Sequence, residues 1–328
     1  MFSVLLRNKP AFAIRVIEVT ADVRLRPENE TLFAMNVQGK TAKHPEASLL
    51  VFPRPSLATR HLLVPREHGS WGLWLFPLVS GAVVGLLSMP EALLEPVLWL
   101  LLTALSAFLI YQPLESILGL SLVKTRSQQQ LQFAVLWVSA LAIAAAIGVA
   151  ELIQLRRSLV LALGLIAVGC FGIRMLLGPS RTMRVPKQVI GALGLSSTAA
   201  GAYYAATGQI GRTGLLLWLA SWLFAVGQIE YVHLRLATAQ VRSRREKVRS
   251  SLTVCFFHLL MAGGAIGAAL AGLVPPFLGL AFIPSLIRLA VWVARPWRPL
   301  GVRVLGVTEL LQGLLFSALL IGVFVVRG

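Results

Sequence analysis

The chain has very few carboxylates. Asp22 is the only aspartate in 328 residues, and Asp and Glu together number 13 against 30 Lys and Arg. No aspartate-rich metal-binding motif can therefore exist beyond residue 22. Charged residues make up 13% of the chain, about half of the roughly 25% that is usual in soluble globular domains. This shortage argues against an ordinary soluble domain.

Cysteine is also scarce. Cys170 and Cys255 both lie in apolar runs, without a CxxC pair, so a disulfide framework is excluded and both are expected to be small buried hydrophobes. There is no HExxH motif and no Cys/His pair at finger spacing, and so no metal site is predicted. The polar residues 7–10 interrupt any signal-peptide core at the amino terminus.

What is abundant is apolar sequence, which accounts for 57% of the chain. From Ser70 onward it falls into nine segments, each near the roughly 20 residues that a helix needs to cross a bilayer. These segments are 70–88, 93–112, 131–150, 158–177, 188–207, 214–232, 251–273, 276–294 and 305–326. The sequence therefore predicts an all-α polytopic membrane protein with about nine transmembrane helices.

Residues 1–64 differ from the rest because prolines and charges break every apolar stretch. We expect a poorly ordered cytoplasmic extension there, followed by a transmembrane domain over residues 65–328. The alternative is that the functional chain begins near Arg60.

The basic residues set the expected orientation. The connections after segments 93–112, 158–177, 214–232 and 276–294 carry fourteen Lys and Arg, whereas the other connections and the carboxyl terminus carry four. The positive-inside rule then puts the amino terminus in the cytoplasm and the carboxyl terminus outside, in the cell (inner) membrane. Arg156 and Arg157 are the local exception. Because the net charge of +17 lies in short loops, not in a separate basic domain, nucleic acid is not an expected partner.

One polar cluster leads directly into the first apolar segment. Arg66, Glu67 and His68 precede a run that contains Trp71, Trp74, Phe76 and Pro77, followed by Gly81 and Gly85 at GxxxG spacing. An interfacial anchor explains the tryptophans and the arginine, and the glycines predict close helix packing. An anchor does not require the Glu67–His68 pair.

This opening carries a resemblance. A short basic lead, then His68, Gly69 and Trp71, then an apolar run with Pro77, resembles the start of the YwiC-like family of bacterial membrane proteins over about twenty residues. The resemblance implies a bacterial integral membrane protein and implies no particular reaction.

Polar residues inside the apolar segments or at their ends all fall on the side predicted to be cytoplasmic. Because ionisable groups at membrane depth are costly, they pair or line a wet cavity. We therefore predict one cytoplasmic-facing cavity that binds a lipid-like or anionic ligand; the alternative is a set of separate interfacial residues. The candidates are Glu67, His68, Gln112, Glu115, Arg181, Glu230, His233, Arg288, Glu309 and Gln312.

The layout is also similar to that of the UbiA-type intramembrane prenyltransferases, which implies a related helical bundle. The resemblance implies an enzyme acting on a prenyl diphosphate-like substrate, with Glu115 and Glu230 as metal ligands and Arg181 and Arg235 holding phosphate. The aspartate-rich motifs of that family are absent here. A transporter with Arg288 and Glu309 as a coupling pair is a further hypothesis. Heme ligation by His68 and His233 is a weaker one, and the isolated His258 is expected to be a hydrogen-bonded packing residue.

Overall fold

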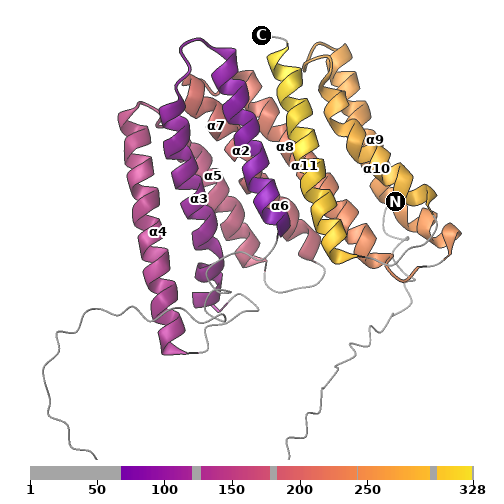
Figure 1. Ribbon diagram of the computed structural model, residues 1–328, viewed down its shortest axis with the longest axis horizontal. Helices are drawn as coiled ribbons and strands as arrows, with labels where there is room; N and C mark the ends of the chain where they lie inside the picture. Colours follow the sequence, from indigo (N-terminus) through magenta and orange to yellow (C-terminus); the bar gives the residue numbers. More distant parts are fainter. Residues whose placement is uncertain (1–67, 120–126, 178–182, 242, 296–300, 327–328) are drawn as a thin grey trace, which may run out of the picture. The chain divides into compact units, whose positions relative to one another are not determined.

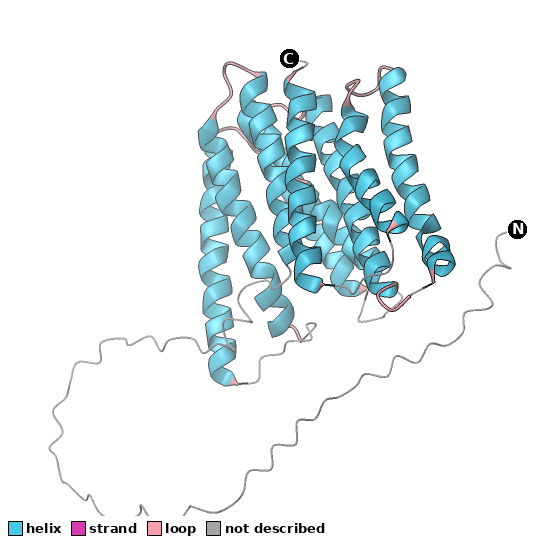
Figure 2. Cartoon of the chain, turned by 45° about the vertical axis from the view of Figure 1, so that its right-hand side comes forward, coloured by secondary structure: helices cyan, strands magenta, loops and turns pink. Residues whose placement is uncertain are grey.

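The computed structural model describes residues 68–119, 127–177, 183–241, 243–295 and 301–326, all within one compact unit, residues 54–328. Its regular elements are all helical, and none of these residues forms a strand (Figures 1 and 2). The predicted extension over residues 1–64 lies outside them. The elements are α2 (His68–Ser88), α3 (Leu94–Ile117), α4 (Gln128–Gln154), α5 (Val160–Leu176), α6 (Arg184–Ser196), α7 (Thr198–Thr207), α8 (Gly211–Ala237), α9 (Arg244–Leu270), η1 (Leu278–Phe282), α10 (Ile283–Ala294) and α11 (Val302–Val325).

Within the described part, six helices are long and apolar enough to cross a membrane: α2, α3, α4, α8, α9 and α11. Helix α5 and the η1–α10 stretch are apolar but shorter. The segment expected at 188–207 appears as two helices, α6 and α7. The all-helical multi-pass architecture is therefore as predicted, whereas the count of nine spans is not confirmed by helix length and composition.

The break between α6 and α7 comes from three consecutive hydroxyl residues. Ser197 Oγ donates to Gly194 O at 2.7 Å, and Thr198 Oγ1 donates to Leu195 O at 2.8 Å. Ser196, which is fully buried, makes a similar bond one residue earlier. Hydroxyls that bond to nearby carbonyls compete with the helical ladder, and they satisfy its last acceptors where the helix stops. The interruption therefore leaves few backbone groups unpaired inside an apolar environment.

Close packing of α2 on α7 confirms the role predicted for the GxxxG glycines. A Cβ atom on Gly81 would lie 2.0 Å from the carbonyl oxygen of Ala199, and one on Gly85 would lie 2.8 Å from Ala206 Cβ. Only glycine allows the two backbones to approach this closely. The contact fixes the position of α2, whose first turns carry the motif that resembles the YwiC-like family.

The tryptophans of α2 are packed against α3. Trp74 is buried and its ring stacks on that of Phe108 with centroids 5.6 Å apart, while Trp71 meets Phe108 edge to face at 5.0 Å. Further along the chain, Phe224 of α8 stacks on Phe316 of α11 at 4.0 Å. These aromatic contacts hold the helices that surround the site in fixed positions.

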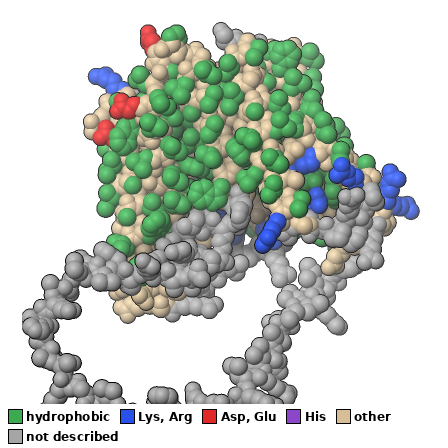
Figure 3. Space-filling view, viewed as in Figure 1, with side chains coloured by type: hydrophobic (Ala, Val, Ile, Leu, Met, Phe, Trp, Pro, Cys, Tyr) green, Lys and Arg blue, Asp and Glu red, His purple; other side chains and the backbone are tan. Residues whose placement is uncertain are grey.

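Large apolar side chains cover the outer surface of the described part. Leu165, Phe256 and Leu260 are each more than 60% exposed, and Figure 3 shows a face that is almost continuously hydrophobic. A surface of this kind fits a multi-pass membrane protein and would aggregate in water. We call the end of the bundle where α2 and α6 begin and α8 and α10 end the basic end (Figure 1). Most of the Lys and Arg side chains visible in Figure 3 gather there.

Candidate functional site

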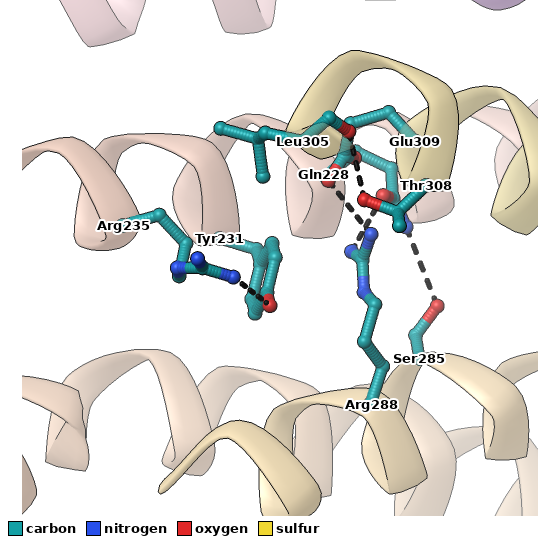
Figure 4. Close-up of polar contacts among 8 residues, drawn as sticks. All are labelled: Gln228, Tyr231, Arg235, Ser285, Arg288, Leu305, Thr308 and Glu309. Carbon is teal, nitrogen blue, oxygen red and sulfur yellow. Dashed lines mark hydrogen bonds and ion pairs between the residues drawn. The ribbon is translucent and has the colours of Figure 1, made fainter. Parts of the chain in front are cut away.

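A buried ion pair joins α10 to α11 near the basic end. Arg288 Nη1 donates to Glu309 Oε1 at 2.7 Å, and each side chain is only 12% exposed. The second nitrogen, Nη2, donates to Gln228 Oε1 of α8, also at 2.7 Å. Gln228 in turn donates from Nε2 to the buried Ser285 hydroxyl at 3.3 Å. Three helices therefore converge on one guanidinium, as Figure 4 shows.

Aromatic faces complete the surroundings of this arginine. The guanidinium carbon of Arg288 lies 3.9 Å from the centre of the buried Tyr231 ring, one turn further along α8 than Gln228. The hydroxyl of Tyr231 accepts from Arg235 Nη1 at 3.0 Å (Figure 4). A cation over an aromatic face is attracted by the ring quadrupole, so Arg288 is held by charge, hydrogen bonds and a ring together. The expected pairing of Arg288 with Glu309 is present.

A first cavity, of about 240 Å³, lies on the Glu309 and Gln228 side of the ion pair. Its walls come from α2, α5, α6, α8 and α11. Gly69 and Ser70, from the motif at the start of α2, are among the lining residues, and so are Phe76 and Phe224 deeper in. The motif that resembles the YwiC-like family therefore forms part of a cavity wall.

Polar groups of the first cavity lie at the ends of its helices. His233 Nε2 and Gln188 Oε1 are 2.6 Å apart, so the imidazole donates to the amide oxygen and links α8 to α6. Arg174, at the end of α5, and Arg184, at the start of α6, are also in the lining. Cations, an imidazole and an amide at one end, with apolar side chains beyond them, form an amphipathic cavity.

Arg174 connects this cavity to the end of α3. Its guanidinium lies 4.7 Å from the centre of the Tyr111 ring, and the Tyr111 hydroxyl donates to Glu115. Glu115 is thus linked to the first cavity through two side chains without lining it.

A second cavity, of about 720 Å³, lies on the other side of the ion pair, between the ends of α8 and α10 and the starts of α9 and α11. Arg288 and Gln312 line this cavity, whereas Glu309 and Gln228 line the first. The hydrogen-bonded set around Arg288 therefore forms a wall between the two cavities.

The predicted site residues are divided by this wall. His233 and Glu309 line the first cavity and Arg288 and Gln312 the second, while Gln112, Glu115 and Glu230 line neither. Glu67, Arg181 and the side chain of His68 lie outside the described part of the chain. The single shared cavity that the sequence predicts is thus two cavities around one ion pair.

Several contributors were not predicted. Gln188, Lys247 and Trp292 reach the cavities through side chains that the sequence alone assigns to loops or to packing. The spacing of Tyr231 and Arg235, four residues apart on one helix, is a signal that could have indicated their contact. His258 behaves as expected: it is fully buried and its Nδ1 lies 2.9 Å from Val254 O.

The described residues contain no group of three or more His, Cys, Asp or Glu side chains that could hold a metal ion. Glu115 and Glu230, the metal ligands implied by the likeness to prenyltransferases, belong to α3 and α8. Neither lines one of the two cavities.

The comparisons with known proteins bear on the amino-terminal part of the helical region. No curated protein and no solved structure matches the chain. The YwiC-like protein family matches over residues 64–203, from just before α2 into α7, a range that includes the Gly69–Ser70 wall of the first cavity as well as Arg174 and Arg184. The resemblance carried by His68, Gly69, Trp71 and Pro77 is thereby confirmed, and over residues 64–203 the chain is that of a YwiC-like protein.

Proposed function

We propose that this protein binds a lipid-like or anionic ligand in its first cavity, which opens to the cytoplasm. The carrying observation is that one cavity is lined both by the family motif at the start of α2 and by the polar ends of α5, α6 and α8. A cavity with these walls lies where a ligand can arrive from the aqueous side of the membrane. Such concave, mostly apolar sites with a few convergent polar groups are typical of small-molecule binding.

The lining favours a ligand with an anionic head and an apolar tail. Arg174 and Arg184 provide positive charge, and the His233–Gln188 pair provides hydrogen-bonding groups beside them. Phe76, Phe224 and other apolar residues line the part beyond. The volume of about 240 Å³ is slightly below the roughly 300 Å³ at which common ligand pockets begin, which suits a small head with a short apolar segment.

The proposed membrane arrangement has nine spans in the cell (inner) membrane, with a cytoplasmic amino terminus and an outer carboxyl terminus. In this arrangement α6 and α7 together form one span, and α5 and η1–α10 form two short ones. Support comes from the basic residues at helix ends: Arg174, Arg184, Arg235, Arg244 and Arg295 all belong to the basic end. Cytoplasmic ends carry such an excess.

Binding can be tested with dodecyl phosphate, which has an anionic head and a single apolar chain. Protein purified in an uncharged detergent is titrated with it, and the bound fraction is followed by native mass spectrometry. The double variant Arg174→Gln/Arg184→Gln should bind at least about tenfold more weakly, because each charged hydrogen bond contributes roughly 1.5–3 kcal/mol. Arg245→Gln/Arg249→Gln, which removes two exposed charges from α9 outside both cavities, should bind as the wild type does.

Equal affinity in both double variants would refute the assignment of the ligand to the first cavity. Dodecanol, which has the same chain without the charge, should bind much more weakly. If it binds as tightly as dodecyl phosphate, the ligand is not selected by its charge, and the anionic part of the proposal fails.

A transporter is the second candidate, because a discontinuous helix and a buried ion pair both border the cavities. Broken helices next to a midplane site are a recurring feature of secondary transporters. Proteoliposomes that contain the protein should then take up radiolabelled butyl phosphate, and Glu309→Gln should abolish uptake while leaving dodecyl phosphate binding in place. Uptake equal to that of protein-free liposomes would remove this candidate.

A further inference from the structure

The second cavity has a different charge from the first. Its lining contains four basic residues, Arg235, Lys247, Arg288 and Arg295, and no Asp or Glu among the described residues. Arg288 is neutralised by Glu309. The other three form no salt bridge with a carboxylate in the described part of the chain. Three positive charges therefore converge on one cavity without a protein anion to balance them.

An indole holds two of these cations near each other. The ring of Trp292 has Lys247 Nζ 4.4 Å from its centre and the Arg235 guanidinium carbon 5.5 Å from it. Lys247 is buried, and its ammonium donates to the carbonyl oxygens of Trp292 and Arg295 at the end of α10. These contacts fix Lys247 at a helix carboxyl terminus, where a cation is favoured. Arg235 spends one N–H on Tyr231, so its fork has further donors for a ligand.

The depth of the cations corresponds to a membrane surface. Arg235 lies in the last turn of α8, Lys247 in the first turn of α9, and Arg295 directly after α10. Arg288 is seven residues earlier on α10, about 10 Å further in at 1.5 Å per residue. The unbalanced charges are therefore at the helix ends, where headgroups lie.

The remaining wall of the cavity is apolar and open to the hydrocarbon. Ile287 and Val304 are 57% and 67% exposed, and Leu315, further along α11, is 43% exposed. A volume of about 720 Å³ leaves room for a headgroup and the first part of its chains. A soluble anion would use the cations and leave this wall without a role.

We propose that the second cavity is a binding site for an anionic phospholipid, with the phosphate held by Arg235, Lys247 and Arg295 and the acyl chains against α10 and α11. Basic pockets between transmembrane helices at the cytoplasmic face bind such headgroups by charge. This site is separate from the first cavity and does not depend on the function proposed for it.

The test uses the full chain in nanodiscs of phosphatidylcholine, with or without phosphatidylglycerol. After mild extraction into detergent, native mass spectrometry counts the phospholipid that stays on the protein. The wild type should retain phosphatidylglycerol in preference to phosphatidylcholine. Arg235→Gln/Arg295→Gln should retain roughly 10- to 30-fold less, since each surface cation contributes about 1 kcal/mol to anionic lipid binding. Arg245→Gln/Arg249→Gln removes the same charge from exposed positions outside the lining and should match the wild type.

Further arms separate the other outcomes. Arg295→Glu changes one exposed side chain and should by itself abolish the preference, so the test remains decisive if loss of Arg235 unfolds the protein. Arg174→Gln/Arg184→Gln, in the first cavity, should leave retention unchanged. Equal retention in all variants, or equal retention of both lipids, would overturn the proposal. Displacement of phosphatidylglycerol by millimolar inorganic phosphate or glycerol 3-phosphate would also overturn it, because the site would then bind a soluble anion.

Discussion

Removal of the Glu309 carboxylate should be strongly destabilising. In Glu309→Ala, Arg288 keeps its bond to Gln228 and its position over Tyr231 but loses its counter-charge while only 12% exposed. Breaking a buried pair by removing one partner costs about 3–5 kcal/mol. The Tyr231 face retains about 0.5–2 kcal/mol of attraction for the cation, so the loss should fall near the lower limit. A decrease in melting temperature on the order of 10 °C follows.

The assay is thermal unfolding in detergent, followed by tryptophan fluorescence. A cycle with Arg288→Met separates the pair from its surroundings: the double variant should recover part of the loss, because it leaves no buried charge without a partner. Glu309→Gln is the matched control, since its amide oxygen still accepts from Arg288 and the shape is kept, and its loss should be smaller. If Glu309→Ala melts with the wild type, or if the two single losses simply add, the pair does not stabilise the protein as we argue.

Two other predictions concern packing and topology. Gly81→Ala should destabilise by roughly 1–3 kcal/mol, because the new Cβ overlaps Ala199 O, whereas Gly164→Ala meets open space and should be neutral or slightly stabilising; thermal unfolding distinguishes them, and equal melting temperatures would contradict the close α2–α7 contact. For orientation, alkaline phosphatase fused after Gly328 should be active and a green fluorescent protein fused there should be dark, because we place this terminus outside. The reverse result would mean that the number of spans is even.

The sequence predicts the helical segments well because each is a long, uninterrupted apolar run. The break at Ser196–Thr198 was not predicted, since hydropathy is blind to hydroxyls that bond to the backbone. Three hydroxyl residues in succession inside an apolar run are the local signal that could have indicated it. Glycine spacing, by contrast, correctly predicted close packing of Gly81 and Gly85, because a missing side chain at that spacing has few other uses in a membrane helix.

The site was only partly predictable. The pairing of Arg288 with Glu309 follows from the cost of burying either charge alone, and it is present. The division into two cavities depends on the direction in which each side chain leaves its helix. Hydrophobic periodicity is weak in helices that are apolar on all sides, so the faces of Glu230 and Gln312 could not be assigned. The role of Trp292 depends on contacts between α9 and α10 that no local pattern encodes.

The wall between the cavities has a thermodynamic consequence. Glu309 and Gln228 face one cavity and Arg288 the other, yet all three belong to the same hydrogen-bonded set. An anion that attracts Arg288 from one side weakens its hold on Glu309, and so alters the charge that a ligand on the other side meets. Coupling of this kind is reciprocal: each ligand changes the affinity of the other by the same factor. With the ion pair removed, that factor should fall toward one, and occupancy of the two sides should become independent.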